Sequence, residues 1–201
     1  YAKVGLKFYE KEMTRRQIAD AEKLAQKIIE KEPKNVEAWE RRGLAMVMQS
    51  HYEDALVPFE AIVEFGESRV LTPALHAFAL YKVERHEEAR VRAEYAVQLD
   101  SADSFAWSVL GIVLVALDDA KGALAAFDKV SEVGEPNTSL LGFRAWALNK
   151  LDRYKEARHC AEQMIKLDSS NQYAWSQLGV AQSDAGEYKR ALKAFEKVVE
   201  L

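Results

Sequence analysis

The sequence is poor in cysteine and proline: its 201 residues include one cysteine, Cys160, and four prolines. A single cysteine excludes an intramolecular disulfide and is compatible with a reducing compartment, so we expect a cytoplasmic protein. Because a free cysteine packs like a small hydrophobic residue, we expect Cys160 to be a buried filler.

Long hydrophobic runs are also missing. The most apolar uncharged stretch, residues 104–117, is too short to cross a bilayer, which takes roughly 20 apolar residues. The first residues, Tyr-Ala-Lys-Val, show no signal-peptide pattern. We therefore expect no membrane insertion. Since the chain does not begin with Met, we also expect it to be a fragment of a longer protein.

Positive charge is scarce, with 28 Lys and Arg against 32 Asp and Glu and a net charge of −4. Binding to nucleic acid needs concentrated Lys and Arg to neutralise phosphates, so we expect no nucleic-acid partner. Residues 100–135 contain an excess of Asp and Glu over Lys and Arg. This excess is either a surface for a basic partner or a solubilising surface, and we favour the second interpretation.

The residue types that carry catalysis or bind metals do not converge. The four histidines, His51, His76, His86 and His159, show no metal-ligand spacing. Glycine-rich phosphate-binding loops and the G-x-S-x-G nucleophile motif are absent. We therefore predict no catalytic residue, no cofactor and no metal, and hence a protein that is not an enzyme. A catalytic domain elsewhere in a longer chain stays an open alternative.

The sequence does contain a regular internal repeat. An alanine returns six times at one constant interval, at Ala21, Ala55, Ala89, Ala123, Ala157 and Ala191. Every second repeat adds large aromatic residues, first Trp39, Trp107 and Trp175 and then Phe59, Phe127 and Phe195. The other repeats place a small residue where these place phenylalanine, at Ala25, Ala93 and Ala161. The chain is therefore predicted to be three copies of a two-repeat block.

Each repeat is predicted to form two helices joined by a turn. In the last repeat, residues 172–184 and 187–199 carry apolar residues at the three- and four-residue spacing of amphipathic helices. The predicted first helices are preceded by residues whose side-chain oxygens can accept from first-turn N–H groups. These residues are Asn35, Asp103, Asn137 and Asn171. The pairs Thr14…Gln17 and Ser50…Glu53 match a capping box.

The pattern resembles that of the tetratricopeptide repeat (TPR) family, whose members share a spaced W…L-G…Y…A…F signature. The last repeat matches it with Trp175, Leu178, Gly179, Tyr188, Ala191 and Phe195. The fourth repeat matches with Trp107, Leu110, Gly111, Ala123 and Phe127. The odd-numbered repeats have Gly5, Pro73 and Leu141 at the tryptophan position. In these odd-numbered repeats the resemblance rests on the constant repeat interval and on the repeated alanine.

The resemblance implies an all-α fold, a right-handed superhelical solenoid of six antiparallel helix hairpins. We expect a single TPR array over residues 1–201. Its predicted units are about 2–35, 36–69, 70–103, 104–137, 138–171 and 172–201.

The resemblance also implies a protein–protein interaction scaffold without enzymatic activity, whose first helices line a concave peptide-binding groove. Carried over to this sequence, the groove positions are nearly all apolar or aromatic. They are Leu71, Phe78, Tyr81, Phe105, Ile112, Val115, Trp146, Asn149, Tyr173 and Val180. An uncharged lining predicts an apolar or helical peptide segment as the ligand. The competing interpretation is that these helices are uncharged because neighbouring helices bury them.

One family ligand is not expected. Family members that bind the acidic tails of heat-shock chaperones use a clamp of Lys, Asn and Arg on the first helices. The Lys and Asn positions of the first repeat are Leu6 and Glu10, and those of the fourth are Ser108 and Ile112. Without the clamp, an acidic tail has no charged partner here.

Two other functions stay open. The repeats could be a regulatory or targeting region of a larger enzyme or assembly, or they could be a homo-oligomerisation module. The last predicted helix reaches Leu201 without the polar capping segment that terminal repeats usually need for solubility. We therefore expect either that the array continues in the native protein or that this end pairs with another molecule.

Overall fold

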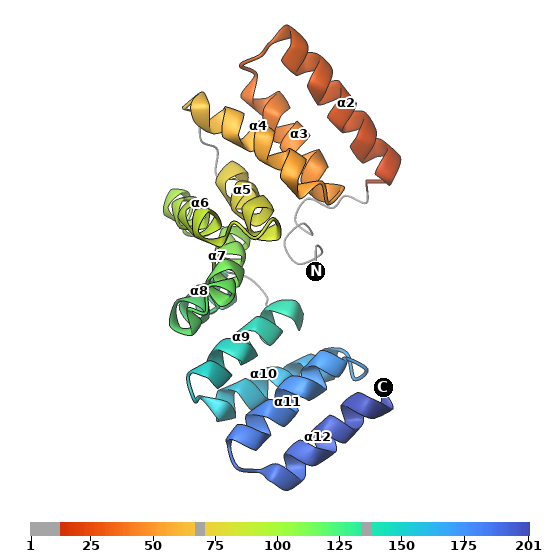
Figure 1. Cartoon of the computed structure of the whole chain (residues 1–201), viewed down its shortest axis with the longest axis vertical. Helices are drawn as coiled ribbons and strands as arrows, with labels where there is room; N and C mark the ends of the chain where they lie inside the picture. The colour runs from red at the N-terminus through yellow and green to blue at the C-terminus, as the bar shows by residue number, and fades with distance from the viewer. Residues whose placement is uncertain (1–12, 67–70, 134–137) are drawn as a thin grey trace. The chain divides into compact units, whose positions relative to one another are not determined.

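A computed structural model describes residues 13–66, 71–133 and 138–201 of the chain. These residues form helices and no strand, which confirms the predicted all-α fold (Figure 1). The helices are α2 (Arg15–Lys31), α3 (Val36–Met48), α4 (Tyr52–Glu64), α5 (Leu71–Lys82), α6 (His86–Leu99), α7 (Ser104–Ala116), α8 (Ala120–Val133), α9 (Thr138–Lys150), α10 (Tyr154–Leu167), α11 (Gln172–Asp184) and α12 (Tyr188–Glu200). The first helix predicted for the first repeat lies outside the described residues.

The chain divides into two compact units, residues 1–113 and residues 114–201. In the first unit each of the helices α2 to α5 packs against the helix that follows it. In the second unit α8 packs against α9, α9 against α10, α10 against α11 and α11 against α12, while α9 also contacts α11. The division falls within α7. The six-unit division of the repeat stays a prediction.

Polar caps begin several helices as predicted. The side-chain oxygens of Asn35 and Asn171 accept from the N–H groups of Ala38 and Ala174 at 3.0 Å. Asp103 accepts from the N–H of Phe105 at 2.8 Å. These bonds satisfy donors that have no partner within the helix. Asn137 lies outside the described residues.

One of the two predicted capping boxes forms and the other does not. Thr14 and Gln17 exchange both bonds of a capping box at the start of α2. The box predicted for Ser50 and Glu53 is wrong, because α4 begins at Tyr52 and no side chain caps it. Ser50 instead closes the turn between α3 and α4 in the left-handed conformation, with φ of 63°.

The left-handed conformation recurs at the same position of every described turn between the helices of a hairpin. The φ angles are 63° at Ser50 and Glu84, 59° at Asp118 and Asp152, and 78° at Gly186. These residues follow one another at the same interval as the repeated alanines. Only glycine adopts this conformation without a steric penalty, so the other four turns carry a small conformational cost.

Two kinds of helix pair hold the hairpins together. In α3–α4, Gly43 lies under the ring of Phe59, and a Cβ on Gly43 would come within 2.5 Å of Phe59 Cε1. Gly179 and Phe195 repeat this arrangement in α11–α12, also at 2.5 Å. In α5–α6 and α9–α10 the corresponding positions hold buried alanines on both helices. These are Ala77 and Ala93, and Ala145 and Ala161.

Candidate functional site

The predicted groove residues all lie on first helices of the hairpins. Three are on α5 (Leu71, Phe78, Tyr81), three on α7 (Phe105, Ile112, Val115), two on α9 (Trp146, Asn149) and two on α11 (Tyr173, Val180). The side chain of Leu71 is outside the described part, and Val115 is half-buried. The other predicted residues gather in two places, one in each unit.

In the first unit the aromatic cluster consists of Tyr52, Phe78, Tyr81 and Phe105. The ring of Phe78 lies 5.9 Å from Tyr52, 6.5 Å from Tyr81 and 6.4 Å from Phe105. The Lys82 ammonium lies over Tyr52, 5.3 Å from the ring centre. These spacings are typical of attractive ring–ring and cation–ring contacts.

Most of the aromatic cluster is covered. Phe78 and Phe105 are buried, whereas Tyr52 and Tyr81 are half-buried. Ile112, the third predicted residue with a buried side chain, also lies in the core. The aromatic cluster therefore contributes mainly to core stability, and only its two tyrosines offer surface to a ligand.

The first unit also has charged lining residues that the sequence reasoning missed. Glu37, Glu40 and Leu44 of α3 stand two repeats before Phe105, Ser108 and Ile112, so the repeat interval alone could have identified them. Together with Arg41, Phe59, Thr72 and Leu75 they line a cavity of about 190 Å³.

The carboxylates of this cavity already have partners within the protein. Glu37 forms an ion pair with Arg41 at 2.6 Å. Thr72 donates its hydroxyl hydrogen to Glu40. Both carboxylates of the cavity are therefore already bound by side chains of the protein.

A second cavity of the first unit, about 180 Å³, lies beside His76. It is lined by Ile62, Val63, Gly66, Thr72, Pro73, His76, Arg92 and Tyr95. Burial, together with the positive charges of Arg92 and Arg85, lowers the pKa of His76 to about 4. The imidazole is therefore neutral at pH 7, and it stacks on the Phe59 ring at 5.6 Å. His76 acts as a core residue of this unit.

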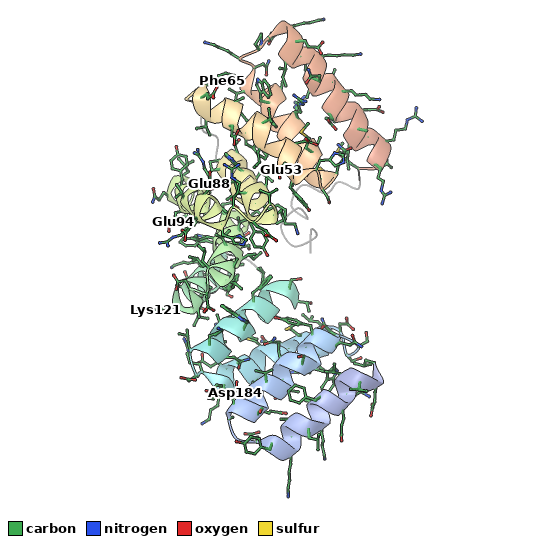
Figure 2. All side chains as sticks on the ribbon, viewed as in Figure 1. Glu53, Phe65, Glu88, Glu94, Lys121 and Asp184 are labelled. Carbon is green, nitrogen blue, oxygen red and sulfur yellow. The ribbon has the colours of Figure 1, made fainter. Side chains whose placement is uncertain are left out.

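In the second unit Trp146, Asn149, Tyr173 and Val180 form what we term the Trp146 surface, on the contacting helices α9 and α11. Trp146, Asn149 and Val180 are half-buried and Tyr173 is exposed. Asp184, which ends α11, is labelled in Figure 2.

Glycine allows Tyr173 to lie close to α9. A Cβ on Gly142 would come within 2.5 Å of Tyr173 Cε1 and 3.3 Å of the terminal methyl of Met164. Gly142 is itself buried. The missing side chain thus leaves the space that the Tyr173 ring occupies, and the outer part of that ring stays exposed to solvent.

Polar groups at the Trp146 surface are amides and one paired cation. The Asn149 amide donates to Gln177 Oε1 at 3.4 Å, and its own Oδ1 is buried without a hydrogen-bond partner among the described residues. The Lys150 ammonium lies 5.5 Å from the Trp146 ring centre and 2.9 Å from Asp118 Oδ1. An unmatched buried acceptor is costly, and because Asn149 Oδ1 has almost no accessible surface, a ligand cannot reach it to remove that cost.

Cys160 lies in the core, as the sequence predicts. It is buried on α10, and burial raises the pKa of its thiol above the usual value. A thiol that stays protonated is a poor nucleophile. Within the described residues no three His, Cys, Asp or Glu side chains gather in a way that could hold a metal ion. None of the described helices combines the length and apolarity that a bilayer crossing requires.

Comparisons with known proteins point to one family. Two family profiles described as tetratricopeptide repeat match residues 24–57 and 144–201. Curated proteins yield no match.

Solved structures share the fold at low sequence identity. The crystal structure of YrrB, described as a TPR protein with an unusual peptide-binding site, is 20% identical with a TM-score of 0.77. The alignment covers 88% of this chain and 91% of that one. A structure described as MamA MSR-1 C2 is 19% identical with a TM-score of 0.76, covering 82% of this chain and 95% of that one. MamA 41-end from Desulfovibrio magneticus RS-1 is 16% identical with a TM-score of 0.74, covering 83% and 94%.

Proposed function

We propose that this chain, which is a tetratricopeptide repeat protein, binds an apolar or helical peptide segment on the Trp146 surface of its second unit. The fold is that of a protein–protein interaction scaffold, and family members are typically not enzymes. The observation that carries the proposal is the exposed Tyr173 ring on α11 and the half-buried Trp146 on the contacting helix α9. The likeness to a TPR protein with a peptide-binding site supports a peptide as the ligand.

Aromatic side chains make this surface suited to an apolar ligand. Trp and Tyr are enriched among the residues that dominate binding energy, because they bury much area and lose few rotamers. Tyr173 is held by Gly142, so its ring is already positioned for contact. Each Å² of apolar surface that the ligand covers contributes roughly 25 cal/mol.

The polar groups of this surface do not require a charged ligand. The Asn149 amide is neutral, its nitrogen donates to Gln177, and its Oδ1 is buried, so this side chain does not favour a charged ligand. The nearby cation, Lys150, is already paired with Asp118. An acidic ligand therefore gains little here, in keeping with the missing clamp of Lys, Asn and Arg.

The test is a selection of peptides from a random twelve-residue display library, followed by calorimetric titration of the enriched sequences. We expect apolar sequences, with binding weakened about tenfold or more by Tyr173→Ala and by Trp146→Ala.

Leu167→Ala is the matched control, because Leu167 is an exposed apolar residue of the same unit that lies on α10, outside the Trp146 surface. It should leave affinity unchanged. Enrichment of acidic peptides, or equal binding by Tyr173→Ala, Trp146→Ala and the wild type, would remove the Trp146 surface as the site.

A further inference from the structure

The last helix, α12, exposes an apolar stripe. Tyr188, Leu192, Phe195 and Val199 follow one another at spacings of four, three and four residues and so lie on one side of the helix. Their exposed fractions are 72%, 59%, 38% and 88%. We term these four residues the α12 face. A contiguous patch of this kind is typical of an interaction site, whereas single exposed apolar residues are common everywhere.

The same stripe occurs in α4, where a neighbouring helix covers its two middle residues. Tyr52, Leu56, Phe59 and Val63 stand four repeats before the members of the α12 face. In the first unit α4 packs against α5. Leu56 is buried and Phe59 is fully inaccessible, at 0% exposure, whereas Tyr52 is half-buried and Val63 is exposed.

A second internal copy, in α8, is also covered. Ala120, Leu124 and Phe127 stand two repeats before Tyr188, Leu192 and Phe195, and all three are buried. Here the covering helix is α9. In both internal copies the leucine and the phenylalanine are thus buried where the first helix of the next hairpin packs, which indicates the kind of element that fits the α12 face.

A flat ring covers the phenylalanine in both copies. His76 of α5 stacks on Phe59, with ring centres 5.6 Å apart and planes 27° apart. Phe143 of α9 stacks on Phe127, at 6.2 Å and 12°. On α12, Phe195 rests on Gly179 from the inside, and its other side is partly open.

Charge adds a further requirement. Asp128 of α8 pairs with Arg144 of α9 at 2.8 Å, and Arg144 directly follows the stacking Phe143. The residue of α12 at the Asp128 position, two repeats later, is Glu196. Neither α5 nor α9 contains an acidic residue. An acceptor for a basic side chain is therefore present at the same place on α12.

We propose that the α12 face binds a partner helix with the chemistry of α9: an apolar helix without acidic residues that stacks an aromatic ring on Phe195 and places an adjacent basic side chain near Glu196. The α8–α9 contact provides this geometry, whereas in α4–α5 the stacking ring, His76, stands at the repeat position of Arg144. The site is distinct from the Trp146 surface and does not depend on the function proposed for it.

The probe for the test is a fluorescently labelled synthetic peptide with the α9 sequence, residues 138–150. We expect saturable binding to the whole chain by fluorescence anisotropy, and induced helicity by circular dichroism. Leu192→Asp places a charge in the centre of the α12 face and should weaken binding at least about tenfold. Because Leu192 is exposed, this variant should keep the fold of the chain.

Two matched controls separate the face from general effects. Leu167→Asp introduces the same charge at an exposed leucine of α10 outside the face and should bind as the wild type does. A peptide with Phe143→Ala should bind several-fold more weakly, because it lacks the ring that stacks on Phe195.

Three outcomes would overturn the proposal. The first is no binding by the wild type, and the second is equal binding by the wild type and Leu192→Asp. The third is a concentration-dependent dimer in sedimentation that Leu192→Asp abolishes, since that result would assign the face to a second copy of the chain.

Discussion

In the hairpins α3–α4 and α11–α12 a glycine of the first helix lies under a phenylalanine of the second, whereas in α5–α6 and α9–α10 alanines occupy both positions. Both arrangements fill the space between the two helices. A large phenylalanine ring fits opposite a glycine, which has no side chain, and two alanines fit opposite each other. Close contact between helices tolerates either combination but not a mixture of them. The difference therefore predicts how each pair responds to substitution.

The largest effect is expected from Phe59→Ala. Phe59 is inaccessible, between Gly43 and His76, so its removal leaves a cavity and should cost about 3–5 kcal/mol of unfolding free energy. Phe195→Ala should cost clearly less, because Phe195 is 38% exposed. Urea unfolding of both variants measures the difference, and equal costs would contradict the different coverage of the two rings.

His76 should make stability depend on pH. Its pKa is about 4 in the folded chain against 6.5 for the free side chain, so the unfolded chain takes up a proton first as pH falls. The free energy of unfolding is therefore not reduced by His76 above pH 6.5. It declines as the pH falls toward 4, by roughly 3 kcal/mol at most.

Urea unfolding at a series of pH values tests this dependence. His76→Phe keeps an aromatic ring on α5 but removes the titrating group. In this variant the unfolding free energy should fall less between pH 6.5 and 4. A loss of the same size in that variant would assign the dependence to other groups, such as Glu88.

Gly43→Ala should cost about 1–3 kcal/mol, because the new Cβ meets a ring that His76 prevents from moving away. Gly179→Ala should cost less, since Phe195 has open space on its other side. In a Phe59→Ala background Gly43→Ala should become stabilising by about 0.5–1 kcal/mol, through the helix propensity of alanine. A double-mutant cycle of Gly43→Ala and Phe59→Ala measures this coupling. Additive effects would show that the two side chains do not compete for the same space.

The smallest effect is expected in the turns. Glu84 has a φ of 63°, where glycine is at least as favourable, so Glu84→Gly should raise stability by up to about 1 kcal/mol. Asp118→Gly should gain less, because aspartate tolerates this conformation better than glutamate. Thermal unfolding of the two variants compares them. A lower melting temperature for Glu84→Gly would show that its side chain matters more than its backbone.

Local features could be read from the sequence. The all-α fold, the TPR family, the caps at Asn35 and Asn171 and the burial of Cys160 each depend on residue type and spacing. The cap predicted at Ser50 is wrong because a serine before an acidic residue suits both a cap and a turn. Its left-handed backbone, which decides between them, has no distinct sequence signal.

The predicted groove residues show the limit of such reasoning. Phe105 and Tyr173 stand at the same repeat position, yet Phe105 is buried and Tyr173 is exposed. Spacing tells which side of a helix a residue is on, but not how much a neighbouring ring covers it. The repeat interval that selects Phe105 and Ser108 also selects Glu37 and Glu40, so these two lining residues could have been predicted from the sequence.

The sequence by itself determined the regular repeat, the positions of the helices and the alternation of phenylalanine with alanine, because these follow from local spacing and side-chain volume. Only the tertiary structure decided which of the equivalent phenylalanines is covered. Phe59, Phe127 and Phe195 are the same residue at the same repeat position, but their exposures are 0%, 2% and 38%. The physical reason is that burial belongs to a pair of helices: α5 packs against α4 and α9 against α8, whereas the outer side of α12 is exposed.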